Sequence, residues 1–132
     1  MWPFRVSKKS VAPEFRGAPA VRRIKHYAAE NGHTYRYFYC GWRLNGSDAT
    51  EYMFECRRDT SAPETVRVIL SRENLDACAA QIGRNLLSSE QYAIVKLALF
   101  RSFDSSNDAL SEAPIVPSSG EMIELLQQLG RM

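Results

Sequence analysis

Apolar and polar residues alternate along two stretches, 35–42 and 51–56, which the turn sequence LNGSDA separates. Alternation with a period of two predicts β-strands, and the turn residues predict that the strands form a hairpin. A two-residue or a four-residue loop gives the same two faces, whereas a three-residue loop, the less favoured alternative, would break this parity. The first face holds Tyr35, Tyr37, Tyr39, Tyr52, Phe54 and Cys56, and the second holds Arg36, Phe38, Cys40, Trp42, Glu51, Met53 and Glu55.

A helical pattern precedes the hairpin. Pro19 suits a first helical position, and Gly32 after Asn31 is a typical stop signal. Between them, apolar residues recur at helical spacing, so residues 19–31 are predicted to form a first helix. The apolar stripe of this helix consists of Val21, Ile24 and Ala28.

The chain after the hairpin predicts a third strand, Thr65–Ser71, and a helix that Ser71 caps and Gly83 ends. Alternation in the strand and the i, i+3, i+4, i+7 spacing in the helix each mark one apolar face. The strand face holds Val66, Val68 and Leu70, and the helix face holds Leu75, Cys78, Ala79 and Ile82.

Two capping boxes predict where the last two helices begin. In the first, Ser88 pairs with Gln91 and Leu87 staples onto Tyr92; the helix Ser89–Ser105 that follows is apolar almost all round, as expected of a central helix. In the second, Ser118 pairs with Glu121 at the start of a C-terminal amphipathic helix. The apolar stripe of that helix holds Met122, Leu125, Leu126 and Leu129.

This order predicts an α+β fold in which helices pack on a small three-stranded antiparallel sheet. The order α-β-β-β-α is that of a double-stranded-RNA-binding domain. Where that family carries a Gly-Pro-x-His loop and a basic helix start, this chain reads LNGSDA and SRENLDACAAQ, so the sequence is assigned to no family. The expected parts are a flexible basic arm (1–17), a core domain (18–105), a Pro- and Ser-containing loop (106–118) and the C-terminal helix (119–132).

Several kinds of chemistry lack a signal in the sequence. Cys40 and Cys56 fall on opposite predicted faces, and no histidine spacing resembles a metal site, so no metal or cofactor is expected. The sequence contains no long apolar run, and MWPFRVSKKS lacks the pattern of a signal peptide, so we expect neither a membrane span nor a secretory signal. Three cysteines without a CxxC motif are typical of a reducing compartment, and we expect the cytoplasm.

Charge is distributed unevenly along the chain. Residues 1–43 carry a net charge of +7, and residues 44–132 carry −5. This asymmetry indicates either attraction between the two parts of the fold or an anionic partner. Nucleic acid, specifically RNA, is therefore the alternative function. Its candidate residues are Lys8, Lys9, Arg16, Arg22, Arg23 and Lys25, with Tyr37 as a stacking surface.

The leading functional prediction is a non-enzymatic protein-interaction or assembly module, either self-associating or adaptor-like. Both faces of the predicted sheet are apolar, and a small monomer seldom leaves such a face open. The partner-binding candidates are Phe38, Trp42, Met53, Met122, Leu125, Leu126 and Leu129. No catalytic motif occurs, and Glu51 and Glu55 share a face with Arg36, which is typical of a cross-strand salt bridge.

Overall fold

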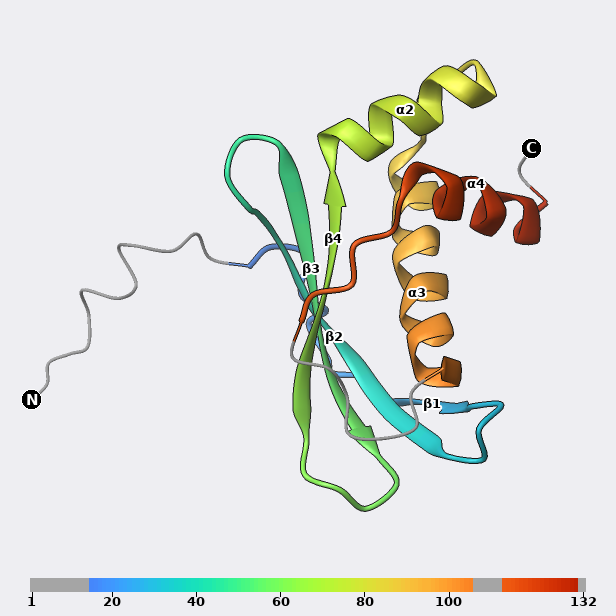
Figure 1. Ribbon diagram of the computed structural model, residues 1–132. Coiled ribbons are helices and arrows are strands. Elements are labelled where there is room, and N and C mark those ends of the chain that lie inside the picture. The colour runs from blue at the N-terminus through green and yellow to red at the C-terminus, as the bar shows by residue number, and fades with distance from the viewer. Residues whose placement is uncertain (1–14, 106–112, 131–132) are drawn as a thin grey trace, which may run out of the picture.

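The computed structural model describes residues 15–105 and 113–130 of the chain. These residues form an antiparallel sheet with the strand order β1-β2-β3-β4 and three helices, connected in sequence order (Figure 1). The strands are β1 (Lys25–Ala28), β2 (Thr34–Leu44), β3 (Ala49–Arg58) and β4 (Glu64–Ser71), and the helices are α2 (Arg72–Ile82), α3 (Ser88–Ser105) and α4 (Ser119–Gln128). Lys8, Lys9 and most of the predicted basic arm lie outside the described residues.

The three helices lie on the same side of the sheet (Figure 1). The core fills the space between them and includes the fully buried side chains of Phe54, Val68, Leu99 and Leu126. Two further residues extend the sheet: Arg16 pairs with Trp42 beside β2, and Ile115 pairs with Val68 beside β4. The predicted α+β class is confirmed, with four strands in place of three.

The predicted helix at 19–31 is wrong. Lys25–Ala28 is the strand β1, and Val21 and Ile24, expected to be buried, are 68% and 59% exposed. The ring of Tyr27 stacks on Phe100 at a centroid distance of 4.4 Å, and Tyr27 Oη donates to Asp104 Oδ2 (2.8 Å). These contacts with α3, together with the pairing of β1 and β2, override a helical preference that rested on a short stripe.

The hairpin combines a three-residue loop with a β-bulge. Asn45 N–H donates to Ala49 O across the loop, and the register shifts between Tyr39 and Gly41. The bulge compensates for the loop, so Tyr35, Tyr37 and Tyr39 face the helices as predicted. Trp42 lies opposite Tyr52 and faces the helices too, which corrects its predicted place on the other face.

Gly41 explains where the bulge forms. Its φ is +120°, a conformation that favours glycine. A Cβ at this position would lie 2.6 Å from the backbone oxygen of Arg16, which pairs with the neighbouring Trp42. The bulge at Gly41 therefore depends on a close contact with Arg16, which lies 25 positions earlier in the chain.

The predictions for β4 and α2 are confirmed. Val66, Val68 and Leu70 are buried, and the Ser71 side chain accepts a hydrogen bond from Asn74 N–H (3.1 Å). Gly83 ends α2 in the left-handed conformation. Helix α2 thus begins and ends where its local sequence predicts, and β4 begins one residue earlier than predicted, at Glu64.

The first capping box is wrong by one residue, and the second is confirmed. Helix α3 begins at Ser88, and Glu90, not Gln91, accepts a hydrogen bond from the backbone of Leu87 (2.9 Å). Arg84 holds the same carboxylate with two hydrogen bonds. In α4, Ser118 and Glu121 form both bonds of the predicted box.

Candidate functional site

The face of the sheet opposite the helices has no helix over it among the described residues; we call it the open face (Figure 1). Strand pairing arranges its side chains in rows across β2, β3 and β4. Apolar and charged residues are mixed there, and most of them are half-buried. The rows, in order, are Arg36–Arg57, Phe38–Glu55–Thr65, Gly41–Met53–Arg67 and Arg43–Glu51–Ile69.

At one end of the open face, the charged side chains form ion pairs with one another. Glu51 is buried, and its two carboxylate oxygens contact Arg43 Nε (3.1 Å) and Arg67 Nη1 (3.4 Å). A buried carboxylate held by two half-exposed guanidinium groups is typical of a structural ion network. The predicted salt bridge to Arg36 is therefore wrong, because the three-residue loop pairs Arg43 with Glu51, whereas Arg36 lies opposite Arg57.

The opposite end of the open face leaves a like-charge pair. Arg36 and Arg57 lie directly opposite each other on β2 and β3. Their guanidinium groups donate to backbone oxygens, Arg36 to Asp59 (3.4 Å) and Arg57 to Thr60 (3.3 Å). Neither forms an ion pair within residues 15–105 and 113–130, and like charges directly opposite each other destabilise a sheet.

A groove of about 160 Å³ adjoins this arginine pair; we call it the open-face groove. Its apolar wall is made by Ile24, Phe38 and Pro63, and its charged wall by Arg36, Arg57 and Glu55. The guanidinium of Arg22 stacks on the ring of Phe38 at 4.8 Å from the centroid. The groove therefore offers an apolar contact surface next to a net positive charge.

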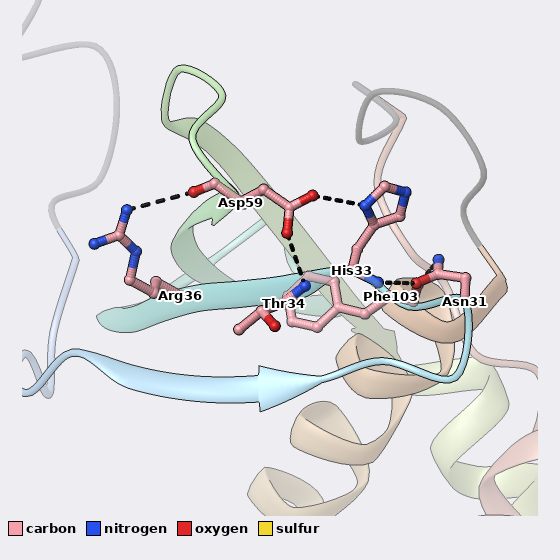
Figure 2. A network of polar contacts seen from close by, with 6 residues as sticks. All are labelled: Asn31, His33, Thr34, Arg36, Asp59 and Phe103. Atoms are coloured by element: carbon pink, nitrogen blue, oxygen red, sulfur yellow. Dashed lines mark hydrogen bonds and ion pairs between the residues drawn. The ribbon is translucent and has the colours of Figure 1, made fainter.

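A polar network at one end of the sheet positions Arg36 (Figure 2). The carboxylate of Asp59 accepts hydrogen bonds from Thr34 N–H (3.0 Å) and contacts His33 Nδ1 (2.6 Å), while its backbone oxygen contacts Arg36. Asn31 links this turn to α3 by donating to Phe103 O (2.9 Å). The hydrogen bond from Thr34 and that from His33 lower the pKa of the Asp59 carboxyl, so it is ionised at neutral pH.

Among the predicted partner-binding residues, the structure brings only Phe38 and Met53 to the open face, both half-buried. Met122, Leu125 and Leu126 are buried where α4 packs on α2 and α3, and only Leu129 of that stripe is exposed. With Trp42 turned toward the helices, the predicted apolar surface becomes smaller. The stripe of α4 completes the core of the chain itself.

The predicted nucleic-acid residues separate into two groups. Arg16, Arg22, Arg23 and Lys25 are exposed, and Arg16 stacks on the ring of Trp42 (5.5 Å). Tyr37 is 5% exposed and packs edge-on against Phe100, so its ring does not form a stacking platform. The cations are accessible, but the aromatic surface expected beside them belongs to the core.

Arg57 is an open-face residue that the sequence reasoning missed. It continues the alternation of β3 by one step beyond Glu55, and this alternation was the available signal. Across the described ranges, no cluster of three or more His, Cys, Asp or Glu side chains is arranged to hold a metal ion. No helix in the same ranges is long and apolar enough to cross a membrane.

Comparison with known proteins supplies no assignment for this site. The chain matches no protein-family model, and no curated protein or solved structure matches it.

Proposed function

We propose that this protein is a non-enzymatic interaction module whose open-face groove binds a protein segment with a large apolar side chain next to a carboxylate. The observation that carries the proposal is the arginine pair Arg36–Arg57, which lies beside the apolar wall of the groove without an ion-pair partner among the described residues. Carboxylates bind arginine through two parallel hydrogen bonds, and one such group between the two guanidinium groups would relieve their repulsion.

An outside partner fits this surface better than a second copy of the chain. Glu51 is already held by Arg43 and Arg67, which leaves Arg22, Arg36 and Arg57 against Glu55 around the groove. Two such surfaces would bring net positive charge against net positive charge, which disfavours association. The free thiols of Cys40, Cys56 and Cys78 support a cytoplasmic location for this function.

Selection from a random linear peptide library, with the purified chain as bait, tests the proposal. The expected enriched peptides pair an aromatic or aliphatic residue with Asp or Glu. Arg57→Met should weaken them about tenfold, the value of one charge-assisted hydrogen bond, and Phe38→Ser should weaken them further. Leu87→Asp, a change at an exposed residue before α3, is the matched control and should bind as the parent does.

Two results would reject the proposal. Enriched peptides that bind the Arg57→Met variant as tightly as the parent would show that the groove is not their site. A concentration-dependent dimer in sedimentation, abolished by Phe38→Ser, would replace the outside partner with a second copy. Circular dichroism of each variant excludes unfolding as the cause.

RNA binding is the second candidate, because the cations Arg22, Arg23 and Lys25 are all exposed and lie close together in the sequence at the start of the sheet. If they contact phosphates, affinity for single-stranded or duplex RNA should fall linearly with salt on a log–log scale. Replacing Arg22 and Arg23 with Ala should reduce the slope by about two, with little change in sequence preference. An RNA affinity that does not change with salt concentration would rule out this candidate.

A further inference from the structure

A second cavity, of about 100 Å³, lies between the edge of the sheet and α3. Lys25 and Tyr37 lie opposite each other on β1 and β2, and α3 contributes Tyr92 and Lys96. Pro19 and Arg23, from the segment before β1, line the same cavity. Residues far apart in the sequence thus converge on one small cavity, which shares Tyr37 and Phe38 with the lining of the open-face groove.

Positive charge is concentrated in this cavity. The ammonium group of Lys96 lies 5.5 Å from the ring centroid of Tyr37, 5.8 Å from that of Tyr92 and 5.7 Å from that of Phe100. These rings stabilise the cation through their π-electrons, yet burial and the neighbouring Lys25 lower the pKa of Lys96. The described lining includes Arg23, Lys25 and Lys96 and no carboxylate.

Tyrosine hydroxyl groups add neutral hydrogen-bond donors. Tyr39 and Tyr92 line the cavity, and burial raises the pKa of both, so each hydroxyl keeps its proton at neutral pH. Three cations and two protonated hydroxyls around a small space form a donor set for an oxyanion. A carboxylate or phosphate there would offset the repulsion between Lys25 and Lys96.

We propose that the cavity between β1, β2 and α3 binds the phosphate group of a small phosphate monoester, held by Arg23, Lys25 and Lys96. A monoester carries close to two negative charges at neutral pH, which matches three converging cations better than the single charge of a carboxylate or a backbone diester. The enclosure by Pro19 and Arg23 favours a terminal phosphate over a continuous strand. None of the three cations proposed to hold the phosphate lines the open-face groove, and two of them, Arg23 and Lys25, are also residues of the RNA candidate.

Titration with inorganic phosphate, followed by NMR of the lysine Cε–Hε signals, tests the site. In the parent chain, phosphate should shift the Lys25 and Lys96 signals and raise the pKa of Lys96, because a bound anion favours its charged form. Lys25→Met and Lys96→Met should each weaken phosphate binding about tenfold. Lys25→Met should also raise the pKa of Lys96 without phosphate, which checks that the two ammonium groups lie close together.

Arg72→Gln, which removes one exposed cation at the start of α2, is the matched control and should bind phosphate as the parent does. Chloride at equal ionic strength should leave the signals unchanged. If chloride reproduces the shifts, or if Arg72→Gln weakens binding as much as Lys25→Met, the effect is general screening and the site does not exist.

The source of the phosphate is resolved by two further ligands. A nucleoside monophosphate should compete with inorganic phosphate, whereas an oligonucleotide without a terminal phosphate should not compete. An oligonucleotide that displaces inorganic phosphate, with the loss of that effect in Lys96→Met, would overturn the monoester assignment in favour of nucleic-acid binding.

Discussion

The two faces of the sheet differ in how they use their polar groups. Under the helices, rings stack on one another, as Tyr35 does on Phe103 at 4.1 Å, and Phe54 and Val68 are fully buried. On the open face, half-buried side chains surround a groove, and Arg36 lies opposite Arg57 without an ion-pair partner in the described part of the chain. The helix-covered face holds the fold together, and the open face keeps unneutralised charge next to apolar surface.

The largest difference between the faces should be seen in truncations of neighbouring residues on β3. Phe54→Ala removes a fully buried ring and should lower the free energy of unfolding by about 3–5 kcal/mol. Met53→Ala, on the open face, should cost about 1 kcal/mol or less, because half of its transfer free energy is not gained on folding. Denaturant unfolding of both variants measures this contrast, and equal losses would show that the open face is a second core.

Glu51 tests the part of the open face that does stabilise the fold. Glu51→Gln keeps the size of the buried side chain but weakens its bonds to Arg43 and Arg67, so unfolding free energy should fall by about 1–3 kcal/mol. The matched variant Glu55→Gln, next to the groove, should change stability little. Urea titrations at neutral pH separate the two, and a loss at Glu55 equal to that at Glu51 argues against the division of the face.

Tyr35 offers a gain of stability on the helix-covered face. Its hydroxyl is buried and has no hydrogen-bond partner among the described residues, although its ring is well packed. Tyr35→Phe keeps the stack on Phe103 and removes the unsatisfied group, which should raise unfolding free energy by about 1 kcal/mol. Tyr27→Phe, which removes a hydroxyl bonded to Asp104, is the control and should lose stability. A destabilised Tyr35→Phe variant would mean that the hydroxyl is paired.

The smallest expected effect is the dependence on pH of the network in Figure 2. The pKa of Asp59 is lower in the folded chain than its ordinary value of 3.8, so its contribution is present above that value and is lost as pH falls through the folded pKa. Asp59→Asn should therefore flatten the loss of thermal stability below about pH 4. Asp76→Asn, on the exposed side of α2, should leave the profile unchanged; equal profiles for both variants would exclude a role for Asp59.

Local patterns predicted much of this structure. Alternation found β2, β3 and β4, and Ser71, Gly83 and the Ser118 box fixed helix ends, because each signal acts within a few residues. The helix at 19–31 and the face of Trp42 were wrong because they depend on distant partners, α3 for Tyr27 and the Arg16 backbone for Gly41.

The candidate sites were harder to predict than the fold. Phe38 and Met53 were placed correctly by alternation, and Arg57 lay one step beyond the residues that were considered. Lys96 was the single cation within the apolar stretch AIVKLALF, but nothing local shows that it meets Lys25. Sites built from a strand and a helix far apart in the chain need the tertiary fold to become visible.

The free energy of unfolding of Arg57→Met, compared with Arg43→Met, is the most direct test of the claim that the open face keeps unneutralised charge. Arg43 holds the buried Glu51, so its replacement should destabilise the chain. Arg57 lies opposite Arg36, and its Nε is enclosed without a hydrogen-bond partner in the described residues, so Arg57→Met should be at least as stable as the parent. If Arg57→Met lowers the free energy of unfolding as much as Arg43→Met does, the arginine pair stabilises the fold and the account is contradicted.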